Sequence, residues 1–565
     1  MDLFKQEIQK ILKQNEICVE LSLIEIPPDT KLGDYAVPCF SLAAKFKKAP
    51  QAISEELVKK INLEKNELLS SVKNVGPYLN FFVNKTQLIN SLIKKIQDQK
   101  ENFGTGNLSS KILVESPGPN TNKPLHLGHL RNVFLGASII NILKKSGNSV
   151  THVDIVNDRG IHICKSMLAY QKFGNNQEPD VKTDHFVGKY YVLYSQKLKE
   201  MPELEEEARE MLRKWEAGDP EVRALWAKMK KWSLDGMNQT YARLNFVAEK
   251  SYFESDQYER GKQIVIEGFE NGLFTKNSDG CIIIDLTKEG YGEKVLLRAD
   301  GTSVYVTQDI STAKARYEDY DMDKIIYVVA TEQNYHFKVL FEVLEKIGFK
   351  FAKNLYHMAY GMVNLPDGKM KSREGTVVDA DELLDQLEQM ARTEIVKRHK
   401  ELSEEEINSR AIKIAQGALR FFILKIDSHK DMVYDPKESI SFEGETGPYV
   451  QYAYARCCSI LRKYDCAVET DIDYSLLESE SAFNLVKQLG TFPQVILDAA
   501  KSHKPSMMAQ FLIQLSQMFN EFYHKCQVIS DDKKLTAARI RLVESTKIIL
   551  KEGLHLLAIE APEEM

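Results

Sequence analysis

Two histidines flank a glycine in the segment His126-Leu127-Gly128-His129, which directly precedes a run of apolar residues with helical spacing. In the first turn of a helix the backbone N–H groups have no partner within the helix, and the helix dipole favours an anion there. Gly128 leaves room for a nucleotide to approach the main chain closely. The imidazoles can donate hydrogen bonds to an α-phosphate while a carboxylate attacks it and pyrophosphate leaves. The segment therefore predicts a nucleotide-activating site, although the spacing alone fits two core or surface histidines as well.

A second basic segment lies far downstream and reads GKMKSREG, residues 368–375. Its glycines suit a mobile loop, and the cations of Lys369 and Lys371 can neutralise a triphosphate as charge moves onto the leaving pyrophosphate. Taken alone, this segment is more simply an exposed basic hairpin. The two segments together are much more specific than either one.

The elements around these segments predict where they meet. Residues 111–115, KILVE, form a short buried-type strand, followed by the loop SPGPNTNKP and a helix over about 125–145. The runs VTHVDIVND (150–158) and KIIYVVAT (324–331) indicate further strands separated by helices. This alternation is typical of an α/β fold with a doubly wound parallel sheet, in which ligands bind at the carboxyl ends of the strands. The loop after Glu115 is thus the predicted site.

The pattern along the chain predicts three domains. Residues 1–105 form a small α/β module that closes with GPYLNFFVN and a polar linker, and residues 106–385 form the Rossmann-type domain with insertions. Residues 386–565 have helical periodicity almost throughout and predict an α-helical domain. Between about 165 and 250 the sequence is charged and helical, which favours a solvated helix face over an insertion that faces an RNA.

Composition limits the classes of protein that need to be considered. The chain has 565 residues, of which 43% are hydrophobic and 28% charged, as expected of a folded multidomain protein without a disordered tract. A net charge of −6 argues against nonspecific coating of nucleic acid but leaves a local RNA-binding surface open. No signal peptide or membrane span is recognisable, so a cytoplasmic protein is expected. The eight cysteines lack metal-ligand spacing and are expected to be reduced: Cys18, Cys39, Cys164, Cys281, Cys457, Cys458, Cys466 and Cys526.

The two signature segments resemble the HIGH and KMSKS motifs of class I aminoacyl-tRNA synthetases, and the residues around them resemble arginyl-tRNA synthetases in particular. The resemblance is carried by VESPGPNTNKPLHLGHLRNVFLG, by YVTQDI (305–310), by ISFEGETGPYVQYAYAR (440–456) and by the C-terminal ARIRLVESTKIILKEGLHLLAIEAPEEM. It implies ATP-dependent activation of L-arginine and its transfer to the 3′-terminal adenosine of tRNA(Arg). It also implies Mg²⁺ as a companion of ATP, no tightly bound cofactor, no separate editing domain and a monomer.

Site residues follow from the resemblance position by position. Tyr305 and Asp309, four residues apart, match the residues that hold the guanidinium group, and Gln333 matches a further substrate contact. A guanidinium is planar, charged and rich in donors, so its pocket needs a carboxylate and a flat or hydroxyl partner. Glu115 and Glu254 are further acidic candidates, although for any one acid a structural ion pair is the simpler interpretation. The contacts to arginine and its adenylate fall on Gly118, Pro119, Asn120 and His129, and those to ATP on His126, Gly128, His129, Lys369, Met370, Lys371 and Ser372.

The second motif departs from the family pattern, because Ser372 stands where KMSKS has its second lysine. In the family this loss accompanies a lysine just upstream of the HIGH motif, and Lys123 occupies that place here. Lys371 is a competing source of the missing charge. The sequence leaves the choice between them open.

The C-terminal helical domain resembles the anticodon-binding domain of this family, and the N-terminal module resembles the domain that touches the tRNA elbow. Tyr449, Tyr452, Tyr454 and Arg456 offer aromatic faces and a cation of the kind that stack and clamp unpaired bases. Their spacing does not suit a single helix face, so some of these tyrosines can be core residues instead.

Three other functions are compatible with parts of the pattern. A small-substrate nucleotidylyltransferase also uses an H-x-G-H site, but the KMKSR segment and the long helical domain count against it. A cysteinyl enzyme would need metal ligands that the sequence does not offer. A noncatalytic RNA-binding relative would have lost the nucleotide site, whereas His126, Gly128, His129, Tyr305 and Asp309 are all present.

Overall fold

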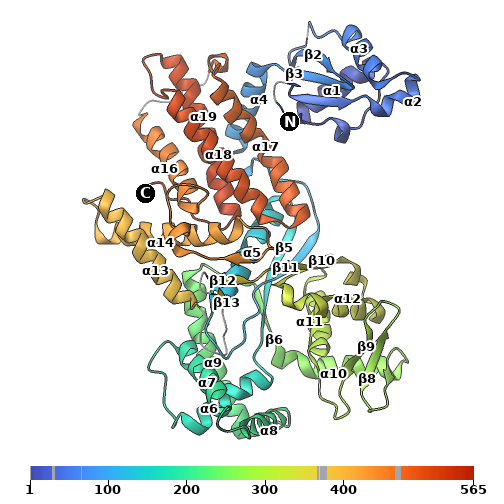
Figure 1. Ribbon diagram of the computed structural model, residues 1–565, viewed down its shortest axis with the longest axis vertical. Helices are drawn as coiled ribbons and strands as arrows, with labels where there is room; N and C mark the ends of the chain where they lie inside the picture. The colour runs from blue at the N-terminus through green and yellow to red at the C-terminus, as the bar shows by residue number, and fades with distance from the viewer. Residues whose placement is uncertain are drawn as a thin grey trace. The chain divides into compact units, whose positions relative to one another are not determined.

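The computed structural model describes residues 2–565 except 28, 30–31, 65, 366–367, 370–377 and 465–471 (Figure 1). Their internal contacts divide them into two compact units. One unit holds Met1–Phe103, Arg456–Gln494 and Gln514–Glu552, and the other holds Gly104–Ala455, Val495–Ile513 and Gly553–Met565. Because this division follows packing and not sequence order, the predicted domain boundaries at residues 105 and 385 stay a prediction.

The larger unit is built on a five-stranded parallel sheet in the order β11-β10-β4-β5-β6 (Figure 1). Strand order reverses between β4 and β10, which is where ligands bind in doubly wound sheets. The predicted α/β fold is therefore confirmed. The strands are β4 (Lys111–Glu115), β5 (Ser149–Val156), β6 (Lys250–Phe253), β10 (Lys324–Ala330) and β11 (Leu355–Tyr360).

Burial explains why these runs are strands and why the following helix lies so close to them. Leu113, Val153 and Ile325 are fully buried, as expected when helices cover both faces of a parallel sheet. Helix α5 (Leu127–Lys145) carries Gly136, where a Cβ would come within 2.2 Å of Ser116 Oγ. This close packing holds the middle of α5 against the residue that follows the end of β4.

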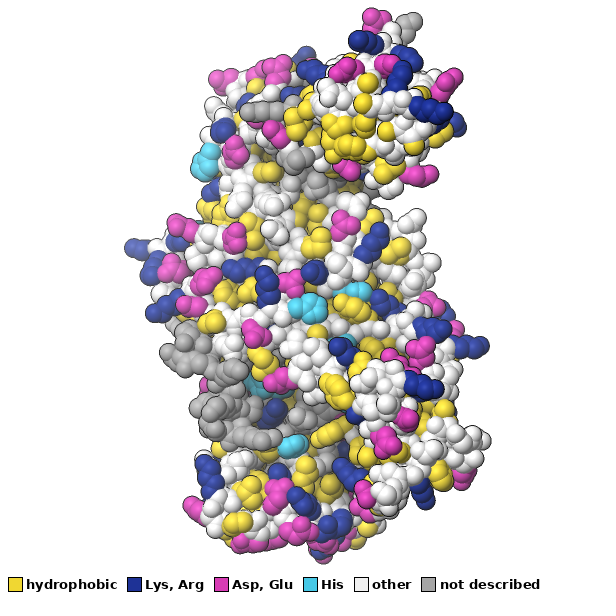
Figure 2. Space-filling model, turned by 45° about the vertical axis from the view of Figure 1, so that its right-hand side comes forward, with side chains coloured by type: hydrophobic (Ala, Val, Ile, Leu, Met, Phe, Trp, Pro, Cys, Tyr) yellow, Lys and Arg dark blue, Asp and Glu magenta, His cyan; other side chains and the backbone are white. Residues whose placement is uncertain are grey.

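Four helices follow β5 and form the charged region of the sequence: α6 (Ile161–Phe173), α7 (Thr183–Lys197), α8 (Leu204–Glu216) and α9 (Pro220–Arg243). Helix α8 buries Leu204, Ala208, Met211 and Trp215, whereas Arg213 on its outer face pairs with glutamates. The charged side chains thus lie on the solvent-exposed sides of these helices. Their buried sides form a small core rich in aromatic residues. On the face drawn in Figure 2, acidic and basic side chains are interspersed.

The remaining elements of this unit surround the sheet. An antiparallel sheet that the sequence analysis did not predict consists of β7 (Thr275–Lys276), β8 (Ile282–Leu286) and β9 (Gly292–Leu297). A second small sheet joins β12 (Val363–Leu365), β13 (Gly368–Lys369) and β14 (Met432–Val433). The other helices are α10 (Glu254–Glu270), α11 (Tyr305–Tyr320), α12 (Asn334–Ile347), α13 (Ala380–Arg398), α14 (Glu404–Leu424) and α15 (Pro436–Ser439).

The smaller unit starts with the predicted N-terminal α/β module. Its antiparallel sheet has the order β1-β3-β2, and GPYLNFFVN supplies the central strand. Its elements are α1 (Asp2–Gln14), β1 (Tyr35–Pro38), α2 (Ala43–Phe46), α3 (Pro50–Lys60), β2 (Leu69–Val75), β3 (Tyr78–Val83) and α4 (Lys85–Gln99).

The C-terminal region is helical, as predicted. It consists of α16 (Gly447–Lys463), α17 (Glu480–Ser502), α18 (Pro505–Lys525) and α19 (Lys533–Leu556). Within the described part of the chain, every helix is too short or too polar to serve as a membrane span.

Candidate active site

A cavity of about 660 Å³ lies at the carboxyl ends of the parallel strands. It extends from the N-terminus of α5, with His126 and Gly128, to the N-termini of α10 and α11, with Glu254 and Tyr305. The sequence pointed to this place through the succession of a strand, a loop rich in glycine and proline, and a helix that begins near His126. The cavity is large enough for a nucleotide and an amino acid together.

The first turn of α5 fixes both histidines of the HIGH-like segment. His126 is the N-cap residue, and its Nδ1 accepts a hydrogen bond of 3.1 Å from the N–H of Gly128. The N–H of His126 in turn donates to Nδ1 of His129 at 3.1 Å. Since both Nδ1 atoms are acceptors, each neutral imidazole carries its proton on Nε2. A Cβ at residue 128 would lie 3.0 Å from Cε1 of His126, so only glycine fits this turn without displacing the ring.

Both imidazoles are uncharged at neutral pH. Burial and then the charge of Lys123 lower the pKa of His126 to about 3, and burial together with His126 and Lys123 lowers the pKa of His129 well below its usual value. The two rings therefore act as neutral hydrogen-bond donors, and the positive charge at this end comes from Lys123, which lines the cavity. Neutral Nε2–H donors beside a helix N-terminus are suited to a phosphate.

The loop after β4 lines the cavity through its main chain. Asn157, just beyond β5, donates from its amide to the carbonyl of Gly118 at 3.1 Å and from its backbone N–H to the carbonyl of Pro119 at 3.0 Å. Gly118 and Asn120 line the cavity, whereas Pro119 is buried and is not among the lining residues. At Gly118 a Cβ would come within 3.2 Å of Ile155, which accounts for glycine there.

The opposite end of the cavity is acidic. Glu115, Glu254 and Asp309 all line it, and the charge of Asp309 raises the pKa of both glutamates in addition to the larger effect of burial. Glu115 is held in a buried ion pair with Arg316, as its alternative interpretation anticipated. Glu254 has no ion-pair partner among the described residues, and its pKa is raised to about 8. A cation placed beside this group would favour its ionised form.

Tyr305 and Asp309 lie one turn apart at the start of α11, so both face the cavity as their spacing predicted. The sequence analysis missed the partner of Asp309. Nε2 of His336 on α12 lies 2.6 Å from a carboxylate oxygen of Asp309. Burial alone would lower the pKa of His336, but the hydrogen bond and charge of Asp309 outweigh it and raise that pKa. His336 follows the predicted Gln333 by three residues, and both line the cavity.

Other lining residues were also missed. Arg159, three residues beyond the end of β5, pairs with Glu216 at 2.5 Å and stacks over the ring of Tyr258 at 4.3 Å. The position of Arg159 after a parallel strand was a usable signal. Tyr360, Gly361, Met362 and Val363 line the cavity from the end of β11 and the start of β12. Nothing in their residue types indicates a site.

The KMKSR segment is only partly described. Lys369 lies in β13, whose main chain pairs with β12. The side chain of Lys369 and all of Met370, Lys371 and Ser372 lie outside the described residues. The roles predicted for them stay predictions.

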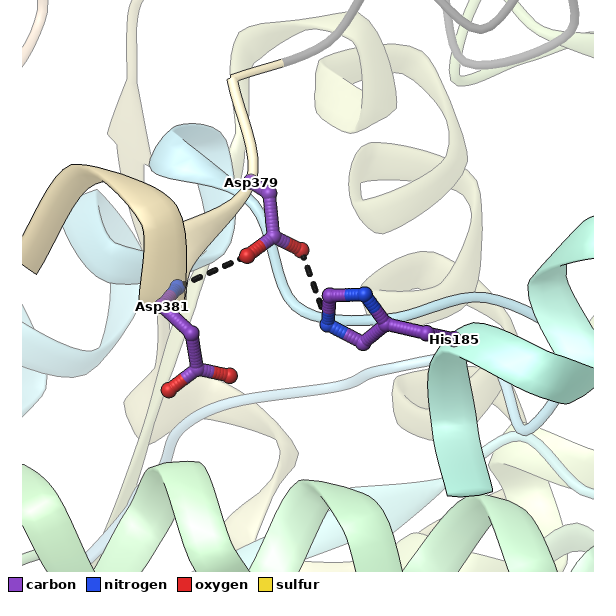
Figure 3. Close-up of side chains that lie close together, drawn as sticks. All are labelled: His185, Asp379 and Asp381. Atoms are coloured by element: carbon purple, nitrogen blue, oxygen red, sulfur yellow. Dashed lines mark hydrogen bonds and ion pairs between the residues drawn. The ribbon is translucent and has the colours of Figure 1, made fainter. Parts of the chain in front are cut away.

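Three side chains that could bind a metal ion lie close together near the start of α13. His185 of α7 and the residues Asp379 and Asp381 at the start of α13 place ligand atoms within 4.8 Å of one another (Figure 3). Nε2 of His185 lies 3.2 Å from Oδ2 of Asp379. Asp381, however, already accepts from Lys182 at 2.9 Å and from Arg243 at 3.0 Å. Two cations at this carboxylate oppose a metal ion, so we interpret the cluster as structural.

The residues predicted to contact tRNA differ in exposure. Tyr452 is 37% exposed, and Tyr449 is half-buried. Tyr454 is fully buried, so its ring presents no face on which a base can stack, and we withdraw it from the predicted RNA surface. Arg456 donates to Asn520 at 2.7 Å and lies 5.0 Å from the ring of Tyr523.

Three family models match the chain. They are described as the arginyl tRNA synthetase N-terminal domain over residues 2–83, the catalytic domain of class I (R) tRNA synthetases over 88–435, and the DALR anticodon-binding domain over 450–565. Together they cover most of the sequence.

Named relatives and solved structures agree with the family models. An arginine–tRNA ligase of Treponema denticola is 45% identical, covering 98% of this chain and 96% of the relative. An arginine–tRNA ligase of Parabacteroides distasonis is 43% identical, covering 94% of this chain and 94% of the relative. The solved arginyl-tRNA synthetase of Thermus thermophilus is 27% identical, covers 100% of both chains and superposes with a TM-score of 0.81. The chain therefore belongs to the arginyl-tRNA synthetases of class I.

Proposed function

We propose that this protein is an arginine–tRNA ligase that forms arginyl-adenylate from L-arginine and ATP and transfers the arginyl group to tRNA(Arg). One observation carries the proposal. A single cavity has neutral imidazole donors, a helix N-terminus and Lys123 at one end, and Glu254 with the Tyr305–Asp309 pair at the other. The first end suits a triphosphate and the second suits a guanidinium.

In the first step the carboxylate of arginine attacks the α-phosphorus, and the bond to pyrophosphate breaks. The Nε2–H groups of His126 and His129 donate to the phosphate oxygens as they gain charge. Because these rings are neutral and already oriented by the first turn of α5, they need not move or lose a proton during the step. Lys123, with Lys369 and Lys371 of the second motif, balances the charge that develops on pyrophosphate.

Arginine is held by charge and shape in this proposal. The guanidinium lies between Glu254, Asp309 and the ring of Tyr305, while Gly118, Asn120 and Gln333 contact the rest of the substrate. An uncharged amino acid of similar size would leave Glu254 protonated and without an ion pair, so it would lack the attraction that a guanidinium gains by ionising this carboxyl group. Such a pocket needs no editing domain.

In the second step a ribose hydroxyl of the terminal adenosine attacks the carbonyl carbon of the adenylate, and AMP leaves. The resemblance to class I implies the 2′ hydroxyl, and it also implies that activation itself requires bound tRNA. Magnesium enters as part of the substrate, bridging the phosphates of ATP. We further propose a monomeric, cytosolic enzyme whose tRNA surface includes Tyr449, Tyr452 and Arg456.

Charging of bulk tRNA with labelled arginine tests the proposal. Wild-type protein should form acid-precipitable arginyl-tRNA in the presence of ATP, and a Glu254→Gln variant should do so with a raised KM for arginine. Wild-type protein that binds tRNA but charges it with no amino acid would instead support a noncatalytic RNA-binding relative.

A further inference from the structure

Arg131 is a buried cation whose guanidinium, among the described residues, donates hydrogen bonds to carbonyl oxygens of the main chain. Its side chain on α5 is 0% exposed. Nη1 donates to the carbonyls of Gly361 at 2.8 Å and Met362 at 3.3 Å, and Nη2 donates to those of Ser428 at 3.0 Å and Lys430 at 2.8 Å. One guanidinium thereby joins two separate segments of main chain to α5.

Its charge persists in this environment. Burial lowers the pKa of Arg131 to about 10, while Tyr360, Asp431 and Asp427 oppose that shift. The group is therefore protonated at neutral pH. Four carbonyl dipoles pointing at one cation are matched by the planar fork of an arginine, and the single ammonium of a lysine cannot reach all four in the same way.

The segments that Arg131 joins pack against each other very tightly. A Cβ at Gly361 would come within 2.5 Å of the main chain of Lys430, so residue 361 must be glycine. The N–H of Gly361 donates to the carbonyl of Ser428 at 2.8 Å, and the N–H of Met362 donates to Asp431 at 2.7 Å. From α5, the guanidinium of Arg131 donates to carbonyls of both segments and so holds them together.

Gly361 and Met362 themselves line the cavity, and so does Val363. The same helix α5 carries Gly128 and His129 in its first turn, one turn before Arg131. The guanidinium thus links the lining strip 361–363 to the helix whose N-terminus forms the phosphate end of the site. It touches neither of the acidic residues Glu254 and Asp309 that form the arginine end.

We propose that Arg131 is a positioning residue for the nucleotide: it fixes the strip 361–363 at the distance from the first turn of α5 that bound ATP requires. This inference rests on the proposed function only in taking the cavity as an ATP site. It predicts that damage at Arg131 appears in nucleotide binding and leaves arginine binding nearly unchanged.

The test compares Arg131→Lys with Arg420→Lys. Arg420 is a second buried arginine of the same unit, 4% exposed, which donates to the carbonyl of Leu244 at 2.6 Å and does not line the cavity. KM values for ATP and for arginine are measured in the charging reaction. In parallel, the rise in melting temperature caused by ATP alone is measured for each variant. Arg131→Met, which has no donors, extends the series if it folds.

Arg131→Lys is expected to raise KM for ATP by about tenfold and to reduce the ATP-induced stabilisation, with KM for arginine within about twofold of wild type. Arg420→Lys should lower the melting temperature to a similar degree and leave both KM values within about twofold. The inference is overturned if Arg131→Lys leaves KM for ATP unchanged, if both KM values rise equally, or if Arg420→Lys has the same effect on ATP. Wild-type protein that is stabilised by ATP but charges no arginine would refute the proposed function and leave this inference standing.

Discussion

Nε2 of His336 lies 2.6 Å from a carboxylate oxygen of Asp309, joining the first turn of α12 to the second turn of α11. Tyr305 precedes Asp309 by one helical turn on the same side of α11. His336 therefore orients the carboxylate that, in our proposal, faces the guanidinium of arginine. A residue of this kind acts through its neighbour and need not touch the substrate.

Replacement of His336 should selectively weaken arginine binding. His336→Asn removes a hydrogen bond to a charged group, which contributes about 1.5–3 kcal/mol, so KM for arginine should rise about tenfold or more. KM for ATP should stay within about twofold. His357→Asn is the matched control, because His357 is also partly buried in this unit and contacts the carbonyl of Val329 at 3.0 Å, but does not itself line the cavity or contact Asp309. Equal effects of the two variants on KM for arginine would contradict the assignment.

Arginine binding should depend on the ionisation of Glu254. Its pKa is raised to about 8 by burial and by Asp309 and Asp158, so the free protein holds a proton there at neutral pH. A guanidinium favours the ionised form, and binding therefore releases this proton. KM for arginine should fall as pH rises from about 6 to about 8, by up to roughly tenfold per unit.

The Glu254→Gln variant supplies the control for this dependence. Its KM for arginine should be raised and nearly independent of pH over the same range. The variant should also melt at a higher temperature than wild type at pH 8, because the unfolded chain ionises Glu254 near its ordinary pKa while the folded protein resists that ionisation up to about 8. A wild-type KM that does not change with pH would refute the role of Glu254.

The imidazoles of the first turn of α5 should contribute no titration to activity near their ordinary pKa. Burial and the charge of Lys123 lower the pKa of His126 to about 3, and burial with the charges of His126 and Lys123 lowers the pKa of His129 well below its usual value. The rate of adenylate formation at saturating arginine should thus show no inflection from these groups between pH 6 and pH 8. His126→Asn keeps a side chain suited to the helix N-cap but removes the Nε2–H donor, and it should slow adenylate formation about 10²–10³-fold with little loss of stability. A rate within threefold of wild type would argue against the donor role.

Substitutions can identify the residue that supplies the charge missing from the second motif. Lys123 lines the cavity and its charge acts on both imidazoles, whereas Lys371 lies outside the described residues. Lys123→Ala should therefore lower the rate of pyrophosphate exchange by about 10²-fold or more, and Lys371→Ala, measured beside it, tests the competing source of charge. Full activity of Lys123→Ala would rule out compensation by this residue.

Substitution of two tyrosines of α16 should distinguish a residue that binds RNA from one that stabilises the fold. Tyr454 is fully buried, so Tyr454→Ala should lower the free energy of unfolding by about 3–5 kcal/mol in urea denaturation. Tyr452 is 37% exposed, and Tyr452→Ala should change stability by about 0.5 kcal/mol or less. If Tyr452 stacks on a base, its loss should raise KM for tRNA about tenfold, since such stacking contributes about 1–3 kcal/mol. An unchanged KM for tRNA would show that Tyr452 is not part of the proposed tRNA-binding surface.

Local patterns predicted the fold correctly, and they led to the candidate phosphate end of the site. KILVE is the strand β4, from Lys111 to Glu115, and the helix expected over 125–145 begins at Leu127. A short apolar run, a loop rich in glycine and proline and a helical repeat are all signals that lie within one stretch of about thirty residues. His126, Gly128 and His129 could be found for that reason.

Residues that act through tertiary contacts could not be found in this way. His336 and Arg131 are placed by the packing of α12 on α11 and of α5 against residues 361–362 and 428–430, and no sequence spacing encodes those distances. The short strands β7, β8 and β9 form a separate antiparallel sheet. A prediction based on the alternation of strands and helices in the parallel sheet therefore did not include them. Tyr454 shows the opposite error, because an aromatic residue beside a predicted RNA surface proved to belong to the core.

Pyrophosphate exchange with each of the twenty amino acids, run with and without bulk tRNA from the source organism, tests the central claim most directly. We predict exchange with arginine alone, and only when tRNA is present. Exchange with a different amino acid would keep the class I chemistry but contradict the pocket formed by Glu254, Tyr305 and Asp309. No exchange under any condition would contradict the account as a whole.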